Sequence, residues 1–444
     1  MTAESAVMNK LGVALAADSA VTVSNRDADK VYSSSDKLFQ LSDTAPVAIM
    51  KSGNADFLGM PWNVLISVYR KQLGNTTFPR LSDYATDFFR FVSKFVRTDA
   101  TVFPRSVQDA WVENYAENVL INVLVDVKHR CEQEENPAQS DKRKQIVIHE
   151  VATEFLKEKR EDSQLPRFGV ASARTLRARY GKTVKKEIRE FFEDFSLPSL
   201  PTKTSRLLET LIFESILRTN PDSDSRTNFD SSATNIVFAG FGEEEYLPAY
   251  LKYAVDGWDD NKLRHYRSEE GKISPEKSGD VGLFGQYNPA YSVAIGVNPD
   301  FLFDMLMHML NGVDEFTEKM MKTFARVTGH EYTARETKKL GLIADEHRED
   351  LLKWVTEYSE ECEEKLYDAV GHLPTSELAT AAEMLVNITK FRQRVSAEQE
   401  TVGGPIDVAL ITKGDGFVWV KKKQYFPAKT EQAGKNDPRV PRMR

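Results

Sequence analysis

The 444-residue sequence lacks the features that mark membrane and secreted proteins. It contains no run of about 18 apolar residues, so we expect no membrane span. It does not open with a basic segment followed by an apolar core, so we expect no secretory signal. Its two cysteines, Cys131 and Cys362, both lie in charged surroundings, which excludes a disulfide framework and favours a reducing compartment. We therefore expect a cytoplasmic protein.

Motifs for bound groups are equally scarce. The seven histidines are scattered and no HExxH pair occurs, so the sequence predicts no metal site and no other cofactor. No GxxxxGK[ST] loop is present, so any ATPase that serves this protein would be a separate chain. The net charge of −8 disfavours nucleic acid as a partner, and the basic run 421–423 is interpreted as a solvated end. The predicted partners thus exclude nucleic acid and membrane.

What the sequence does contain is an ordinary globular composition, 41% hydrophobic and 28% charged. Runs of strand-like residues open the chain, return near residue 233 and close it, and helical patterns fill the space between them. The clearest hairpin lies at the end, where Gly-Asp-Gly joins the apolar runs 406–412 and 417–421. Separate blocks of strands and helices favour a layered α+β fold over a doubly wound parallel sheet.

Some local expectations are specific enough to compare with a structure. Helical spacing predicts a first helix over 54–73 and two separate helices over 299–311 and 315–327. The many polar residues of 256–277 predict a surface loop, and the composition of 291–296 predicts a strand. Each of these expectations follows from periodicity or polarity alone.

The order of the blocks divides the chain into a core, two helical parts and a tail. We expect the core to combine three separated segments, because strand signals appear in all three. The Pro-, Lys- and Arg-rich tail has few apolar residues and is predicted to be disordered. The parts are a core of 1–78, 229–300 and 374–423, a helical insertion of 79–228, a helical segment of 301–373 packed on the core, and a tail of 424–444.

The first two dozen residues carry the lead toward function. They are typical of a strand, a tight turn at Gly12 and a second strand. Thr2 has a small side chain, which normally lets the cell remove the preceding Met1, and the mature chain would then begin with a threonine that has a free amine. An α-amine titrates near pH ~7.7–8.0, so hydroxyl and amine together can act as nucleophile and base.

These residues resemble the start of the proteasome β-type peptidases, including the HslV-type subunit, within the N-terminal nucleophile hydrolases. Those proteins begin with Thr, turn at a Gly, reach Asp-Ser after a strand, open a later strand with Lys, and turn at a Gly before the first helix. The resemblance covers 2–75 well and returns over 233–300 and 375–421. The matching residues here are Thr2, Gly12, Asp18, Ser19, Lys37 and Gly53.

The resemblance implies a four-layer αββα sandwich with helical insertions and a threonine-type peptidase or amidohydrolase, with a peptidase preferred. Thr2 would attack a carbonyl carbon, and the Lys37 ammonium would favour loss of the hydroxyl proton. Asp18 would hold that ammonium, and the Gly53 N–H would face the developing oxyanion. Thr22 falls where the family has a substrate-binding threonine. The family also implies a polypeptide or peptide substrate, homo-oligomeric rings and, in many members, a separate ATPase or other regulatory chain.

The chain departs from the family where an Asp and a Ser steady the N-terminal amine. The matching positions here are Gln399 and Val402. In a shifted register Glu400 or Thr401 would take this role, and Ser278 is a further candidate.

This departure keeps a second hypothesis open, in which the chain is a catalytically inactive proteasome-like scaffold or a regulatory interaction protein. Asp18 would then be a turn acid, Lys37 an edge-strand lysine and Gly53 a turn glycine. A third hypothesis, within enzymes, is hydrolysis of a small amide, because a nucleophile alone does not define the substrate.

Overall fold

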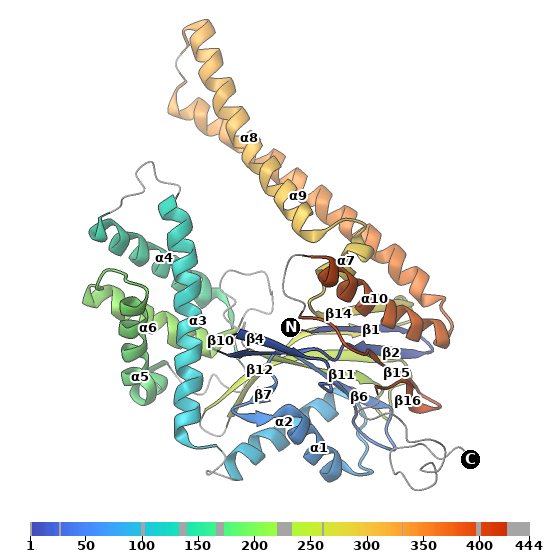
Figure 1. The fold of residues 1–444 in the computed structure, drawn as a ribbon. Coiled ribbons are helices and arrows are strands. Elements are labelled where there is room, and N and C mark those ends of the chain that lie inside the picture. Colours follow the sequence, from blue (N-terminus) through green and yellow to red (C-terminus); the bar gives the residue numbers. More distant parts are fainter. Residues whose placement is uncertain are drawn as a thin grey trace.

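The computed structural model describes residues 2–25, 28–98, 103–132, 140–165, 173–219, 233–259, 262–330, 332–396 and 401–423. The chain has an α+β fold with two five-stranded antiparallel sheets at its centre (Figure 1). The predicted α+β class is therefore confirmed. Within the described ranges, no helix combines the length and apolarity that crossing a membrane requires. The tail 424–444 lies outside these ranges.

The first sheet joins the two ends of the chain. Its strand order is β14–β1–β2–β15–β16, and all neighbours are antiparallel. The predicted opening and closing hairpins are both present, and they lie side by side because β2 pairs with β15. The strands are β1 (Ala3–Asn9), β2 (Gly12–Ala17), β14 (Gly279–Gly285), β15 (Asp407–Thr412) and β16 (Gly416–Lys421).

The second sheet has the order β13–β12–β11–β6–β5. The loop expected over 256–277 is wrong, because most of this segment belongs to the long β12–β13 hairpin. One of its charged pairs lies inside the fold, because Arg264 is buried and ion-paired with Asp256 at 2.6 Å. The strands are β5 (Leu38–Gln40), β6 (Val47–Ser52), β11 (Thr234–Gly240), β12 (Ala249–Asp259) and β13 (Lys262–Lys272).

Apolar residues lie on both faces of each sheet. Because side chains alternate along a strand, Ala6 and Met8 of β1 pack toward the second sheet, whereas Val7 packs against α10 (Thr375–Val395). The outer face of the second sheet is covered by α1 (Trp62–Leu73) and α2 (Leu81–Thr98). Helices therefore lie outside the two sheets, and an apolar layer lies between the sheets.

The helices between 105 and 217 share an apolar cluster of their own, beside the sheets. They are α3 (Arg105–Glu132), α4 (Asp141–Glu161), α5 (Ala173–Asp194) and α6 (Thr202–Leu217). The described structure also contains three short strand pairs. They are β3 (Val21–Asn25) with β4 (Ala28–Tyr32), β7 (Asp56–Phe57) with β8 (Met60–Pro61), and β9 (Ser163–Gln164) with β10 (Arg218–Thr219).

Three local predictions are wrong in their details. The first helix begins at Trp62, since the β7–β8 hairpin occupies the residues before it. The strand expected over 291–296 is helix α7 (Asn288–Ile295), whose first turn contains a proline that suits a helix start. The two helices expected on either side of Gly312 are one helix, α8 (Pro299–Thr328), followed by α9 (Ala334–Gly371). A helical glycine costs about 1 kcal/mol, too little to end such a long helix.

Candidate functional site

Thr2 lies immediately before β1, at the end of the first sheet, and is only 6% exposed. The N–H of Gln286 donates to its carbonyl oxygen at 2.7 Å, which extends the β1–β14 ladder by one residue. By alternation, Thr2 shares with Ala6 and Met8 the face turned toward the second sheet. The hydroxyl predicted as nucleophile is thus held at the rim of the space between the sheets.

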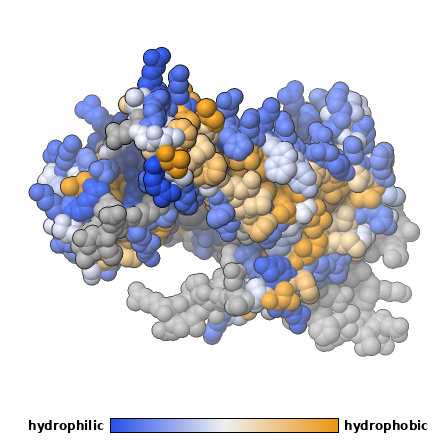
Figure 2. All heavy atoms as spheres, turned by 90° about the horizontal axis from the view of Figure 1, so that it is seen from above, coloured by the Kyte–Doolittle hydropathy of each residue, from blue (hydrophilic) through white to orange (hydrophobic). Residues whose placement is uncertain are grey.

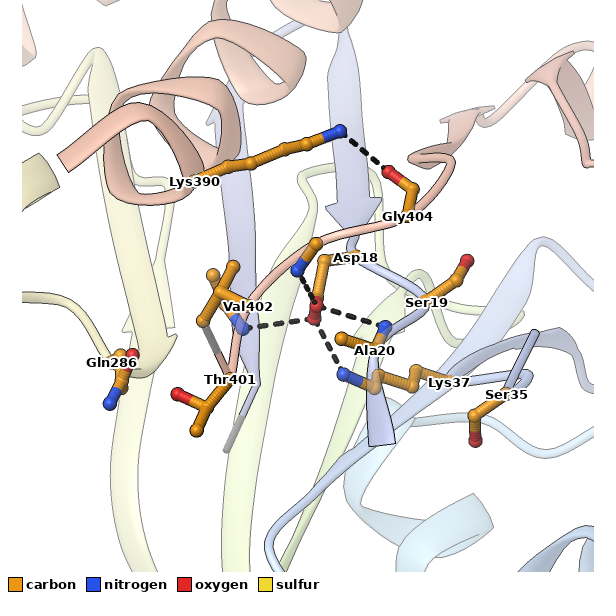
Figure 3. A network of polar contacts seen from close by, with 12 residues as sticks. Asp18, Ser19, Ala20, Ser35, Lys37, Gln286, Lys390, Thr401, Val402 and Gly404 are labelled. Atoms are coloured by element: carbon orange, nitrogen blue, oxygen red, sulfur yellow. Dashed lines mark hydrogen bonds and ion pairs between the residues drawn. The ribbon is translucent and has the colours of Figure 1, made fainter. Parts of the chain in front are cut away.

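Asp18 follows β2 and is almost fully buried. One carboxylate oxygen, Oδ1, accepts the Lys37 Nζ at 2.6 Å and the Ala3 N–H at 3.1 Å. The other, Oδ2, accepts the backbone N–H groups of Ala20 at 3.1 Å and Gly403 at 3.0 Å. Figure 3 shows these bonds meeting at Asp18. The carboxylate therefore joins the first strand, the Lys37 segment and the segment before β15.

Lys37 lies just before β5 and is 3% exposed. Burial lowers the pKa of its ammonium from the ordinary value of 10.5, and the neighbouring Asp18 carboxylate opposes part of that shift. Because the ion pair with Asp18 is buried, it holds the lysine in one place. Lys37 can therefore present a fixed ammonium to a group in front of it, and it gives up its proton more readily than an exposed lysine.

Gly53 follows β6 and has a backbone φ of +89°, which glycine adopts without strain. A Cβ on this residue would lie 2.6 Å from the carbonyl oxygen of Ala233, so the neighbouring strand also requires a glycine here. Thr2, Lys37 and Gly53 line one pocket. The remaining lining residues are Ala20, Val21, Ser35, Lys51, Asn54 and Ala55.

The other predicted site residues that the structure describes do not line this pocket. Thr22 lies on β3, where its backbone pairs with Val31, next to the pocket residue Val21. Thr401 is buried, and its hydroxyl and N–H both donate to the side-chain oxygen of Gln393 in α10, at 3.0 and 2.9 Å. Glu400 lies outside the described residues.

Ser278 cannot steady the amine of Thr2. It precedes β14 at the end where Gly279 pairs with Asn9, whereas Thr2 lies at the end where Gly285 pairs with Ala3. At about 3.4 Å per residue the two positions are roughly 25 Å apart. The Ser278 hydroxyl instead packs against Gly371 at the end of α9. This prediction is corrected, because a strand, not a turn, separates Ser278 from the site.

Two buried charged residues beside the pocket were missed by the sequence reasoning. Glu4 of β1 is 2% exposed, and Lys51 of β6 is 6% exposed and lines the pocket. Burial raises the pKa of Glu4 from 4.5 to about 8, and burial lowers the pKa of Lys51 from 10.5 to about 8. A signal existed in the sequence, since each interrupts a short apolar strand, AESAVMN and VAIMKS.

The Glu4 carboxyl group lies in the field of three charged neighbours. Lys37 and Lys51 lower its pKa, and Asp18 raises it, although none of these outweighs burial. Ser52 lowers the pKa slightly, yet neither carboxyl oxygen has a hydrogen bond of ordinary geometry in the described chain. With a pKa of about 8, Glu4 is mostly a neutral acid at pH 7.

A further correction concerns the run 421–423. Its last residue, Lys423, is 9% exposed and forms ion pairs with Asp407 at 2.5 Å and Asp36 at 3.1 Å. It is close enough to lower the pKa of Lys37. One lysine of this run therefore belongs to the buried charges behind the pocket.

Comparison with known proteins finds similar solved structures but no matching family model. No family model matches the sequence, and no curated protein matches it. Among solved structures, a Gly-1 mutant of Anbu from Hyphomicrobium sp. strain MC1 is 10% identical, with 95% of this chain and 86% of that chain covered and a TM-score of 0.26. Anbu from Yersinia bercovieri, described as an ancestral beta-subunit, is 9% identical, with coverages of 95% and 88% and a TM-score of 0.28. Because these scores are low, we infer nothing about this chain from them.

The chemistry available at the pocket follows from its lining. Thr2, the fixed cation Lys37 and the backbone of Gly53 line the pocket together. In the described part of the chain, no group of three or more His, Cys, Asp or Glu side chains is placed to hold a metal ion. The arrangement suits nucleophilic attack by Thr2 with charge stabilisation by the protein's own groups.

Proposed function

We propose that this chain is an N-terminal threonine hydrolase whose nucleophile is the hydroxyl of Thr2. The observation that carries the proposal is the single pocket lined by Thr2, Lys37 and Gly53, with Asp18 fixing Lys37 from behind. These four residues come from separate segments of the chain. Three of them line one pocket and the fourth is ion-paired with Lys37, which favours a reaction centre over four unrelated structural roles.

In the proposed reaction, the Thr2 oxygen attacks an acyl carbon and its proton passes to the α-amine of the same residue. The Lys37 ammonium stabilises the forming alkoxide, and the Gly53 N–H stabilises the negative oxygen of the tetrahedral intermediate. The amine leaving group takes the proton and departs, which leaves an ester on Thr2. Water then adds to the ester carbon, and the acid product and the free hydroxyl are released.

The proposal extends to properties that accompany this chemistry in the family the opening residues resemble. We assign the two sheets and their covering helices to the four-layer αββα arrangement. We propose a polypeptide or peptide substrate, a cytoplasmic and homo-oligomeric protein, no cofactor, and a separate ATPase or other regulatory chain as a candidate partner. A small amide remains the alternative substrate, and profiling with peptides and simple amides distinguishes the two.

Covalent labelling tests the proposal. A peptide epoxyketone bonds to both the hydroxyl and the free amine of an N-terminal threonine, so intact mass should rise by one inhibitor mass. The same spectrum shows whether Met1 has been removed, which the amine requires. We expect one adduct on the wild type, none on Thr2→Ala, and an unchanged adduct on Thr76→Ala, since Thr76 is an exposed threonine. A correctly processed chain that stays unlabelled at high inhibitor concentration would refute catalysis.

One observation favours the inactive scaffold as a second candidate. Val402, at a position where the family has a polar residue, is fully buried and packs into the apolar cluster beneath α10. It offers no polar group to the amine of Thr2. The scaffold hypothesis predicts a processed chain with no adduct and no hydrolysis of peptides or amides.

A further inference from the structure

The two longest helices of the described chain form a hairpin that projects from the sheets (Figure 1). α8 has 30 residues and α9 has 38, and at 1.5 Å per residue their lengths are about 45 and 57 Å. The base of the hairpin is attached to the core. Tyr291 of α7 donates to Glu363 at 2.5 Å, and the Asn9 side chain donates to the Val370 carbonyl at 3.1 Å.

Large apolar side chains are exposed along this hairpin at helical spacing. Five of them on α8 are spaced by 7, 4, 4 and 3 residues and three on α9 by 11 and 4, so each subset occupies one face of its helix. Other exposed apolar side chains lie off these faces, namely Phe301, Phe303 and Met307 on α8 and Leu342 and Leu352 on α9. Phe316 is 67%, Val327 76% and Trp354 59% exposed. We name the following residues the apolar face: Met309, Phe316, Met320, Phe324, Val327, Ile343, Trp354 and Tyr358.

Both sets lie on the same side of the hairpin. Half-buried positions mark where each helix turns toward the other, such as Val313 and Thr317 on α8 and Val355 and Ser359 on α9. At 100° per residue, the exposed set of each helix lies roughly a quarter turn before its half-buried set. α8 and α9 run antiparallel, so an equal rotation about each helix axis, taken along its own chain direction, places both exposed sets on the same side of the hairpin. Figure 2 shows the molecule from above, with a band of hydrophobic residues between hydrophilic margins.

The apolar face is large enough for a stable protein interface. A large aromatic side chain buries about 150–250 Å². A half-exposed one can therefore lose on the order of 100 Å² of exposed surface, and the smaller but more exposed Val327 and Ile343 offer a similar area. The eight residues of the apolar face therefore offer about 800 Å², which is the contribution of one partner to an interface of standard size.

The charges along the hairpin indicate the partner. Its tip, residues 319–339, carries six basic and two acidic side chains in the sequence. The remainder, 299–318 and 340–371, carries fifteen acidic and three basic side chains. A second hairpin laid antiparallel would place each basic tip against an acidic base, whereas a parallel one would place like charges together. The surface is thus complementary to a reversed copy of itself.

We propose that the α8–α9 hairpin is a self-association surface, on which two copies of this chain pair antiparallel through the apolar face. The contact is isologous, with a twofold axis near the middle of α9, around residue 350. Positions equally distant from that axis then meet across the interface. This places Ile343 opposite Tyr358 of the other copy and Lys339 opposite Glu361. The proposal does not depend on the hydrolase activity of the Thr2 pocket.

A disulfide tests this arrangement directly. In a chain with Cys131→Ser and Cys362→Ser, the further changes Ile343→Cys and Tyr358→Cys should give a covalent dimer on mild oxidation. Within one chain the two positions are about 22 Å apart along the helix, far beyond disulfide reach. Either cysteine alone should give no dimer, because each lies away from the axis. If the double-cysteine chain stays monomeric while circular dichroism shows a normal fold, the antiparallel contact is wrong.

Charge reversal tests the orientation by sedimentation of the uncross-linked protein. The wild type should sediment as at least twice the 50.3 kDa chain mass, more strongly at low salt. Arg335→Glu with Lys339→Glu should weaken association at least tenfold, and so should Glu361→Lys with Glu364→Lys, while an equimolar mixture of the two variants should recover it.

Lys182→Glu with Lys185→Glu on α5 is the matched control and should leave association unchanged. A parallel pair would already contain like-charge contacts, so the single-end reversals would not weaken it. A wild type that remains at the mass of one chain at all concentrations and salts, or that associates only with another protein or with vesicles, overturns the proposal.

Discussion

Of the two buried carboxyl groups near Lys37, that of Asp18 accepts four hydrogen bonds, whereas that of Glu4 accepts none of ordinary geometry in the described chain. Both carboxyl groups are buried to the same degree. They differ in position along their strands. Asp18 lies just beyond the end of β2, and Glu4 lies within β1.

The position of a carboxyl group along its strand matters because backbone N–H groups inside a sheet are already hydrogen-bonded to the neighbouring strands. Past the end of a strand, backbone N–H groups such as those of Ala20 and Gly403 are free to turn toward a carboxylate. Inside β1, the backbone N–H groups belong to a strand paired on both edges, with β2 and β14. A buried carboxylate needs donors to stay charged. The comparison teaches that a buried carboxyl group finds backbone donors beyond a strand end, whereas within a strand it lacks them and its pKa rises.

The largest effect is expected for Asp18→Asn. This change removes the charge that balances the buried Lys37 ammonium, and breaking a buried pair from one side costs about 3–5 kcal/mol. Urea unfolding at pH 7 should show a loss of this size, and epoxyketone labelling of Thr2 should fall with it. The matched control is Asp43→Asn, whose 3.6 Å contact with Arg70 is exposed and is worth no more than about 1 kcal/mol. If both variants lost the same free energy of unfolding, the buried Asp18–Lys37 pair would be no more important for stability than an exposed pair.

A pH-dependent effect is expected for Glu4→Gln. Between the ordinary pKa of 4.5 and the raised value of about 8, the folded chain keeps a proton that the unfolded chain releases. This carboxyl group therefore makes the free energy of unfolding fall as pH rises, by about 1.4 kcal/mol per pH unit. Glutamine has no such proton, so the stability of the variant relative to wild type should rise by about 2–3 kcal/mol from pH 5 to pH 7.

Denaturant unfolding at several pH values measures this difference. Parallel curves for the wild type and Glu4→Gln would mean that Glu4 is an ordinary charged carboxylate, and the contrast with Asp18 would disappear. Glu244→Gln, at an exposed residue outside the charge cluster around Lys37, serves as the control for a generic loss of one carboxylate.

The smallest effect is expected for Thr401→Val, on the Asp18 side of the pocket. The Gln393 oxygen that accepts the Thr401 hydroxyl also accepts two backbone N–H groups, of Thr401 and of Val402 at 2.8 Å. Losing one bond of three should cost about 1 kcal/mol. If Thr401 has only this structural role, the labelling rate of Thr2 should stay within about twofold of wild type. A much slower rate with unchanged stability would instead support the predicted contact with the amine.

Sequence reasoning reached the residues whose role is local. Thr2 stood out because it follows Met1, and Asp18, Lys37 and Gly53 stood out because their order along the chain resembles that of the proteasome β-type peptidases. It missed Glu4 and Lys51 because a charged residue within a strand normally indicates a face exposed to solvent. Only the packing of the second sheet on the first shows that these two residues are buried. It misplaced Ser278 because sequence distance does not reveal the length of a strand.

The sequence by itself determined the α+β class, the opening and closing hairpins and the order in which Thr2, Asp18, Lys37 and Gly53 appear, since periodicity, turn residues and motif order are properties of neighbouring positions. Only the tertiary structure decided which groups share a pocket and which charges are buried together. It also decided that residues 299–371 form a hairpin with one apolar face. The physical reason is that burial and the electric field at a residue depend on groups far away in the chain.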